Sequence, residues 1–550
     1  MEETPEPVEQ HGSTVAVSIT RRVRQGREPE FEAWLQGITT AASRYPGFLG
    51  VQVIRPVAGS REYRAVVRFD SERNFRNWDE SEERQAWYSI SEELTEDQPV
   101  RTNISGTGQE RALAVALSPL DSFVRTSVSG IGLLLLGTGL ALIMANSPLA
   151  EFYERLWQTE ITVGVADFRI AESLRHWVND GLMALFFFIV GLEIKRQVLV
   201  GEMRYPRQAA LPISAAVGGA VIPALIYAGF NWGGPGADGW GVPMATDTAF
   251  SLGILSLLGS RVRPLLLVFL TTFAIVDDIL AVLVIAIFYT EEITWSWVAI
   301  TVALLGALIV ANAAGFHRWP VYAALGLAVW LAVYESGVHA TIAGVLVAMT
   351  VPARSWINPS EFLVRARKAI EDFEAACYAT ASMLSNEPQQ RATQELEGLC
   401  EDVETPMTHL QHRLNPWVAY GVLPVFAFAN AGIPVVSGLG DALSSPVTWG
   451  VIVGLVVGKP IGITLFAWLA VRAGIAILPG AISWRHIVGV AFLGGIGFTI
   501  SLFIAELAFE PGSIANLART GILAGSVIAG SVGYLWLNAT LPPPRDDEES

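Results

Sequence analysis

Two adjacent carboxylates, Asp277 and Asp278, lie near the middle of the apolar segment LLLVFLTTFAIVDDILAVLVIAIF. A charged side chain at that depth in a lipid bilayer costs at least about 2.5 to 3.5 kcal/mol, so its presence usually serves a function. Consecutive residues of a helix point about 100° apart, so one carboxylate can face an ion cavity while its neighbour faces another helix. The alternative is that both carboxylates only hydrogen-bond to neighbouring helices. The pair therefore indicates a site for a cation or a proton.

Lys459 is the candidate partner for one of these carboxylates, because it lies inside another apolar segment, GVIVGLVVGKPIGITLFAWL. The chain has only three lysines, Lys195, Lys368 and Lys459, among many arginines. A lysine loses its proton on burial more readily than an arginine, so a titratable cation inside a membrane has to be a lysine. The alternative is a lysine that extends from the end of a span to the membrane surface.

Two apolar segments contain residues that interrupt a continuous helix. They are GVPMATDTAFSLGIL, with Pro243 before Thr246, Asp247 and Thr248, and VAFLGGIGFTISLFI, with Gly494, Gly495 and Gly497. Paired interruptions point to an inverted repeat whose half-helix ends meet at an ion site. We expect Asp247 to offset facing helix N-termini and Lys459 to offset the opposing C-termini. Close helix packing is the alternative explanation for the glycines alone.

The composition is that of a polytopic α-helical membrane protein. Of 550 residues, 52% are hydrophobic and 17 are Trp, and the mean hydropathy is +0.43. Blocks of roughly 20 apolar residues predict about 12 transmembrane helices, centred near residues 134, 186, 220, 250, 277, 303, 328, 344, 423, 458, 497 and 525. The charge-rich stretches 1 to about 120 and 354–412 predict soluble segments. The net charge of -16 excludes nucleic acid as a partner, because no basic patch is present to meet a phosphate backbone.

The distribution of charges predicts the orientation in the membrane. Connections after even-numbered spans hold mostly arginine and lysine, and those after odd-numbered spans mostly aspartate and glutamate, which is the positive-inside pattern. The first odd connection is mixed, since it holds Arg155, Arg169 and Arg175 among its acids. The N-terminus lacks the basic start and apolar core of a secretory signal. We therefore expect a multi-pass protein of the bacterial inner membrane, with both termini and the insert 354–412 in the cytoplasm.

Residues 13–110 predict a small cytoplasmic α+β domain, between a disordered tail, 1–12, and a linker, 111–122. The patterns give a strand, a helix, the strands FLGVQVIR and EYRAVVRF, and a polar helix that Ser71 caps. This order, with Trp34, PGFLG and the stretch from Trp78 to Trp87, resembles the antibiotic-biosynthesis-monooxygenase-like domains. That resemblance implies a ferredoxin-like fold that usually pairs into dimers. The membrane domain, 123–540, precedes a polar tail, 541–550.

Both cysteines, Cys377 and Cys400, lie in the insert, which we expect to form amphipathic helices. No zinc-ligand spacing is present. Two reduced cytosolic thiols are expected ahead of a disulfide or a metal site.

Seven stretches occur in order between residues 123 and 540: RHWVNDGLMALFFFIVGLEIKRQ, PMATDTAF, FAIVDDI, ESGVHATIAGVL, LPVFAFANAG, VGKPIGI and LGGIGFTIS. They resemble the signature stretches of the NhaA family of sodium/proton antiporters. That family is itself one of the standard examples of inverted-repeat transporters with interrupted helices. The resemblance therefore implies this fold for residues 123–540.

By position, the resemblance implies that Asp278 is the principal Na+ ligand with Asp277 beside it, and that Lys459 pairs with Asp277. Thr246 and Asp247 would form the crossing of the interrupted helices, whose breaks hold Pro243, Gly494, Gly495 and Gly497. Asp180, Glu193 and His339 match positions associated with the cytoplasmic funnel, the pH response and the periplasmic side. By residue type alone, His339 is as readily a packing residue.

Two residues depart from the family pattern. Gln197 and Gln411 stand where the family commonly has acids, and both positions belong to the funnel region. The departures bear on the pH-activation profile and leave the transport chemistry in place.

The resemblance implies secondary exchange of Na+ or Li+ for protons, at a site open to one side at a time, without ATP or a resident cofactor. If Asp278 and either Asp277 or Lys459 each carry a proton against one Na+, the exchange moves net charge. The expected partners are sodium ions, protons, the lipid bilayer and a second copy in a homodimer.

Two other classes of function stay open. A channel or a carrier of another ion could share the fold. Alternatively, the N-terminal domain could be an oxygenase or a sensor, with the spans as its anchor. Trp34, Trp78 and Arg44 have residue types that could orient an oxygenase substrate, and a core role is the alternative for the two tryptophans.

Overall fold

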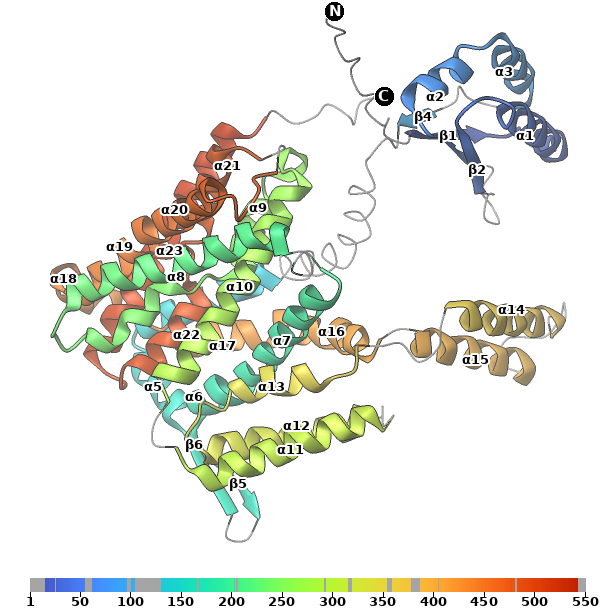
Figure 1. The fold of residues 1–550 in the computed structure, drawn as a ribbon. Helices are drawn as coiled ribbons and strands as arrows, with labels where there is room; N and C mark the ends of the chain where they lie inside the picture. The colour runs from blue at the N-terminus through green and yellow to red at the C-terminus, as the bar shows by residue number, and fades with distance from the viewer. Residues whose placement is uncertain are drawn as a thin grey trace, which may run out of the picture. The chain divides into compact units, whose positions relative to one another are not determined.

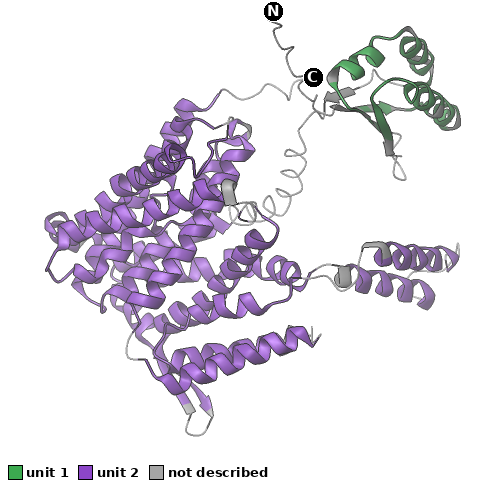
Figure 2. Ribbon diagram, in the orientation of Figure 1, with its two compact units in different colours: residues 1–120 green, residues 121–550 purple. Residues whose placement is uncertain are grey.

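The structure is a computed structural model of the chain. It describes residues 15–24, 26–54, 62–95, 100–103, 130–165, 168–201, 203, 206–290, 293–314, 319–353, 359–376, 386–403, 405–479 and 482–542. It divides into two compact units, 1–120 and 121–550 (Figure 2). The expected tail 1–12, the linker 111–122, Cys377 and residues 543–550 of the polar tail lie outside the described residues.

The N-terminal unit is an α+β fold with one four-stranded antiparallel sheet. Its elements are β1 (Val15–Arg22), α1 (Glu28–Ala42), β2 (Phe48–Ile54), β3 (Glu62–Phe69), α2 (Glu72–Asp79), α3 (Glu82–Leu94) and β4 (Val100–Asn103). The strand order is β2-β3-β1-β4 (Figure 1). The predicted strand, helix, strand, strand, helix order is present, and the structure adds α3 and β4. Ser71 caps α2 as expected, because its Oγ accepts from the Asn74 N–H at 3.3 Å.

The core of this unit lies between the sheet and the helices. Phe31 and Leu35 of α1 pack with Tyr63 of β3, and all three are buried. Trp34 and Trp78 are also buried, at 7% and 3% exposure, so both tryptophans take the core role that the sequence left open. A four-stranded sheet with helices on one face can bury enough apolar area to be stable by itself.

Within the described residues, the second unit is helical apart from one hairpin of strands. A helix, Gly130–Ala145, precedes α5 (Ala150–Gln158), β5 (Glu160–Val165), β6 (Phe168–Ser173), α6 (Leu174–His176), the π-helical η1 (Trp177–Leu182), α7 (Met183–Leu199), α8 (Pro206–Asn231), the 3-10 segment η3 (Ala237–Met244), α9 (Thr248–Ser256), η4 (Gly259–Arg261), α10 (Pro264–Phe288), α11 (Trp295–Ala313), α12 (Trp319–Glu335) and α13 (Ile342–Thr350). After the insert helices α14 (Pro359–Ala375) and α15 (Glu387–Val403) come α16 (Pro406–Trp417), the π-helical η6 (Val418–Val422), α17 (Leu423–Asn430), α18 (Val435–Ser444), α19 (Pro446–Val453), the π-helical η7 (Gly454–Gly458), α20 (Lys459–Arg472), α21 (Trp484–Leu493), α22 (Phe498–Ala508) and α23 (Ser513–Thr540).

The unit is a helical membrane protein by the length and composition of its helices. Within the described ranges, five helices are long and apolar enough to cross a bilayer: Ala209–Asn231, Pro264–Phe288, Trp295–Ala313, Pro446–Arg472 and Ser513–Thr540. Two bent pairs raise the number of candidate spans to seven: Gly130–Ala145 with Ala150–Gln158, at 115°, and Trp484–Leu493 with Phe498–Ala508, at 50°. The remaining predicted centres fall on shorter helices, so the count of about 12 stays a prediction.

The two predicted interruptions are breaks of the helical backbone. The chain leaves η3 at Met244, runs extended at Ala245 and re-enters a helix, α9, at Thr248. The second break separates α21 from α22 at residues 494–497. A proline and a group of glycines cause these breaks, because both residue types weaken a helix interior.

The insert forms two helices that pack on each other, as its amphipathic pattern predicts (Figure 1). Ala366 and Ala369 of α14 and Ala392 and Leu399 of α15 are buried there. Cys400 is a free, exposed thiol. Cys377 lies outside the described residues, so the expectation of two reduced thiols stays a prediction.

Helices α8 and α20 approach so closely that their backbones touch. A Cβ added at Gly462 would lie 2.1 Å from the carbonyl oxygen of Gly218, and one added at Gly218 would lie 2.2 Å from that of Gly462. Small residues allow such backbone contact between helices in a membrane. Because α20 begins at Lys459, this contact sets the position of the lysine.

We predict that Gly462→Ala lowers the melting temperature of the purified protein by several degrees, since overpacking a tight contact typically costs about 1 to 3 kcal/mol. Thermal unfolding followed by size-exclusion chromatography measures the change. Gly229→Ala is the matched control on α8, because a Cβ there meets nothing within 4 Å. Equal melting temperatures for the two variants would show that α8 and α20 can move apart without a loss of stability.

Candidate functional site

Asp277 and Lys459 form an ion pair in the interior of the second unit. Asp277 comes from α10 and Lys459 from the first turn of α20. The lysine Nζ donates to Asp277 Oδ1 at 2.9 Å and to Oδ2 at 2.8 Å, and to Thr246 Oγ1 at 2.8 Å. Lys459 is 0% exposed and Asp277 1%. A pair so far from water is stable only because each charge is matched and hydrogen-bonded.

Asp247 lies where the two helix breaks cross. Its Oδ1 accepts from the Phe250 N–H at 3.1 Å, at the N-terminus of α9. Its Oδ2 accepts from the Thr499 N–H at 3.1 Å and from Thr499 Oγ1 at 2.5 Å, at the N-terminus of α22. One carboxylate therefore caps two helices, which is the arrangement that offsets two facing positive dipole ends.

The breaks are also joined through their backbones. The Asp247 N–H donates to the Ile496 carbonyl at 2.6 Å, and Thr246 Oγ1 donates to the Gly494 carbonyl at 2.7 Å. Glycine is required at 495, because a Cβ there would lie 2.4 Å from the Leu455 carbonyl oxygen. Pro243 in η3 and Gly497 before α22 border the same crossing.

Asp278 faces a different environment from its neighbour Asp277. It lines a cavity together with Asp247, Thr248 and Thr499, and the cavity extends to Glu193 and Asn415. Thr248 Oγ1 lies 3.4 Å from Asp278 Oδ2. The helical rotation between adjacent residues therefore points one carboxylate to Lys459 and the other to the cavity. Carboxylate and hydroxyl oxygens around an open space can coordinate a small hard cation.

Glu193 on α7 also lines this cavity and is the centre of a polar cluster. Its carboxylate accepts from Arg196 Nε at 2.9 Å and makes a second, shorter contact with Nη2 of the same arginine. It also accepts from Gln197 Nε2 at 3.1 Å and from Gln411 Nε2 at 2.5 Å. The two glutamines that depart from the family pattern thus converge on one carboxylate. Sequence reasoning missed Arg196, although its position three residues after Glu193 was a signal.

Asp180 and His339 lie outside this cavity. Asp180 is in η1, at the opposite end of the continuous helix from Glu193, and His176 Nε2 is 3.0 Å from its Oδ2. Thirteen residues of helix separate Asp180 from Glu193, or about 20 Å. His339 Nε2 is 2.5 Å from the Tyr289 carbonyl, between α10 and α13. The structure therefore brings together the residues at Asp278 and leaves Asp180 and His339 apart from them.

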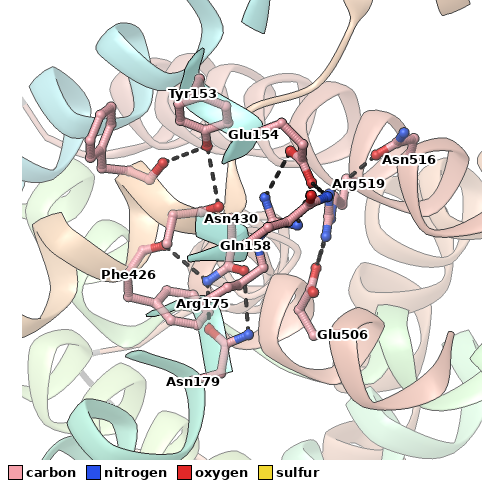
Figure 3. A network of polar contacts seen from close by, with 12 residues as sticks. Tyr153, Glu154, Gln158, Arg175, Asn179, Phe426, Asn430, Glu506, Asn516 and Arg519 are labelled. Atoms are coloured by element: carbon pink, nitrogen blue, oxygen red, sulfur yellow. Dashed lines mark hydrogen bonds and ion pairs between the residues drawn. The ribbon is translucent and has the colours of Figure 1, made fainter. Parts of the chain in front are cut away.

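A second polar network includes Asn179, the residue before Asp180 (Figure 3). Asn179 and Asn430 bond to each other through their amides, at 2.7 and 3.4 Å, and join η1 to α17. Glu506 of α22 and Arg519 of α23 form a buried ion pair. Sequence reasoning did not single out these charges. The rule that drew attention to Asp277 applied to them as well, because both border apolar segments.

The residues considered for oxygenase chemistry in the N-terminal unit do not form one group. Trp34 and Trp78 line a cavity inside that unit, whereas Arg44 is exposed and is not among the residues that line it. The three residue types therefore do not make a common substrate site.

Comparison with known proteins gives two family matches. Residues 121–537 match the family described as Na+/H+ antiporter 1. Residues 14–89 match the family described as antibiotic biosynthesis monooxygenase. The chain is 46% identical over 435 residues to the Na(+)/H(+) antiporter NhaA of Koribacter versatilis, covering 78% of this chain and 93% of that protein.

Two further proteins are similar to parts of the chain. The Na(+)/H(+) antiporter NhaA of Oleidesulfovibrio alaskensis is 46% identical over 425 residues, covering 77% of this chain and 94% of that protein. A putative antibiotic biosynthesis monooxygenase from Nitrosomonas europaea is a solved structure with 9% identity and a TM-score of 0.17, covering 18% of this chain and 95% of that one. From the first family match and these identities, the chain belongs to the NhaA family of Na+/H+ antiporters and carries an antibiotic-biosynthesis-monooxygenase domain at its N-terminus.

Proposed function

We propose that this chain exchanges Na+, with Li+ as an alternative, for protons across the membrane. The observation that carries the proposal is the different surroundings of two adjacent carboxylates. Asp277 is bonded to Lys459, while Asp278 lines the cavity that extends to Glu193. A carboxylate in such a cavity can hold either a cation or a proton. Because the two ions compete for Asp278, their fluxes are coupled without ATP.

The crossing of the helix breaks supports a site that opens to one side at a time. Asp247 holds the N-termini of α9 and α22 next to Asp278. Half-helices joined by few bonds can shift as rigid pieces, which changes the side from which the site is reached. Asp247 and Thr246 serve this movement, and Asp278 is the Na+ ligand with Asp277 beside it. K+ is too large for so tight a carboxylate site.

The exchange moves net charge if two protons cross against one Na+. Asp278 carries the first proton, and Asp277 carries the second, with Lys459 as its structural partner. The membrane potential then contributes about 2.3 kcal/mol per net charge for each 100 mV. Sodium export in exchange for protons follows, which serves sodium and pH homeostasis.

The positive-inside pattern supports an orientation in which the Glu193 end of the cavity faces the cytoplasm. The protein then has about 12 spans in the bacterial inner membrane, with the insert and both termini on the cytoplasmic side. Glu193, Asp180 and His339 contribute to the pH response. Gln197 and Gln411 donate to the Glu193 carboxylate where the family commonly has acids, so the departure bears on the pH-activation profile.

A homodimer is supported by the exposed β5–β6 hairpin. Ile161 and Val163 on β5 are 40% and 55% exposed. A two-stranded hairpin with apolar residues in water gains stability by pairing with another copy. The N-terminal unit is an attached module in this proposal and takes no part in ion exchange.

The first prediction from this proposal concerns Asp278, the proposed Na+ ligand. Asp278→Asn should abolish Na+-dependent and Li+-dependent proton release in everted vesicles, because an amide cannot trade a proton for a cation. Asp441→Asn, an exposed carboxylate on α18, should leave the release unchanged. Near-normal exchange by inserted Asp278→Asn protein would refute the site. Sodium flux that continues without counter-transport would instead indicate a channel.

The second prediction concerns Lys459. Lys459→Leu leaves Asp277 without its cation, and breaking one side of a buried pair typically costs about 3 to 5 kcal/mol, so its melting temperature should fall. Lys459→Arg restores the charge and should recover part of that loss. The Lys459→Arg protein should still exchange Na+ for H+, with a shifted pH profile. Its exchange in proteoliposomes should still respond to an imposed membrane potential. Exchange that no longer responds to the potential would assign the second proton to Lys459.

The third prediction concerns the N-terminal unit. Deletion of residues 1–110 should leave Na+/H+ exchange measurable, since the antiporter match begins at residue 121 and the two units have separate cores. The truncated protein is compared with the full chain at equal amounts in the membrane. Complete loss of exchange in a correctly inserted truncation would make the N-terminal unit part of the transporter.

A further inference from the structure

The two helices of the insert leave different kinds of side chain exposed. On α14, the large apolar side chains of Leu363, Val364 and Ile370 are 62%, 71% and 48% exposed. Among the side chains of α15 that the structure describes, none of the large apolar ones is exposed. The exposed residues of α15 include the acids Glu395 and Glu397. Only α14 therefore presents an apolar surface outside the hairpin.

The packing of the hairpin does not use this apolar surface. Helix α14 packs against α15, and its buried residues are the small side chains of Ala366 and Ala369. Leu363 and Ile370 are seven residues apart, so they lie on one side of the helix. They are exposed on a face that the hairpin itself leaves uncovered. Apolar side chains grouped in this way mark a surface that binds another molecule or a membrane.

Positive charge accompanies the exposed apolar residues. The cations Arg365, Arg367 and Lys368 lie between Val364 and Ile370, and all three are exposed. Three acids follow within residues 371–374, in the second half of the helix. The chain as a whole has a net charge of -16, so a basic and apolar half-helix stands apart from the rest of its surface. Basic residues beside apolar ones on a helix are typical of helices that lie on anionic membranes.

The attachment of the insert keeps this half of α14 close to the membrane unit. The Pro352 carbonyl accepts from the Met407 N–H at 3.1 Å, so both ends of the insert leave the membrane unit at one place. Helix α14 begins at Pro359. Seven residues of extended chain after Pro352 span at most about 25 Å. The half of α14 that is apolar and basic is also the half nearer to this attachment along the chain.

We infer that the first half of α14 lies on the surface of the bilayer and binds the headgroups of anionic lipids. Arg367 and Lys368 contact the lipid phosphates, and Leu363, Val364 and Ile370 enter the outer part of the acyl chains. The inference rests on the proposed function only for the side of the membrane, which is cytoplasmic in the orientation given above. Lipid binding itself does not require ion exchange at Asp278.

The test is fluorescence quenching of the full-length protein in lipid nanodiscs. Cys377 and Cys400 are replaced by serine, and Val364→Cys then carries a bimane label, whose apolar ring keeps the character of that position. Glu395→Cys, an exposed position on α15, carries the label in the matched control. The discs contain nitroxide-labelled phosphatidylcholine, either with phosphatidylcholine alone or mixed with phosphatidylglycerol. Quenching by the nitroxide reports that the label is at the bilayer.

We expect the label at residue 364 to be quenched more strongly, by about twofold or more, in the discs with phosphatidylglycerol, because the cations are attracted to anionic lipid. High salt should reduce this difference. Arg367→Gln combined with Lys368→Gln should abolish it. Arg391→Gln removes an exposed cation from α15 and should leave it unchanged. The exchanged side chains are all exposed, so each variant should elute like the parent protein in size-exclusion chromatography.

Each result supports or overturns the inference. Quenching that depends on phosphatidylglycerol and that only the double variant loses supports it. Equally weak quenching of the labels at residues 364 and 395 overturns it. Equal quenching at residue 364 in both kinds of disc overturns the anionic-lipid assignment. A label at residue 364 that is shielded from aqueous iodide but not quenched by lipid would show that protein covers this face instead. Na+/H+ exchange is measured separately on the same variants, so failure of the lipid test does not count against the proposed transport.

Discussion

The cost of placing charge in an apolar interior is the constraint on which the membrane unit depends. Lys459 and Asp277 are both nearly inaccessible, and each is tolerated because the other is within 2.9 Å. Their pairing leaves Asp278 as the carboxylate on the cavity side. A single carboxylate at this depth could neutralise the lysine or bind an ion, but it could not do both at once. Two adjacent carboxylates on one helix, about 100° apart, allow both.

The broken helices follow from the same constraint. Free N–H groups at a helix end are partial positive charges, and two such ends can meet inside an apolar region only if an anion lies between them. Asp247 supplies it by accepting from Phe250 and Thr499. The backbone contact of Gly218 with Gly462 brings α20 close enough for Lys459 to reach both Asp277 and Thr246. The pairing of Lys459 with Asp277 therefore depends on the close packing of α20 on α8.

Buried charge also organises the parts of the chain away from the ion site. Around Glu193, two amides complete the hydrogen bonding that one arginine begins, so the cluster is satisfied without further titrating groups. In the N-terminal unit, two guanidinium groups are stacked on Tyr88 beside an apolar cavity. In both places neighbouring groups hold the charges: Arg196 and two amides bind Glu193, and Asp79 pairs with Arg84.

The sequence by itself determined the features whose physics is local. The depth of Asp277 and Asp278 in an apolar run, the rarity of lysine, the proline and glycine interruptions, and the strand and helix order of the N-terminal unit all follow from neighbouring residues. The family resemblance had already given Asp277 as the partner of Lys459, and the structure has this pair. Only the tertiary structure decided which residues converge on Glu193 and that Asp180 lies at the other end of its helix. It also decided that Arg21, and not Arg44, lines the N-terminal cavity. These outcomes depend on side chains far apart in the chain, and the packing that joins them leaves no periodic signal in either segment.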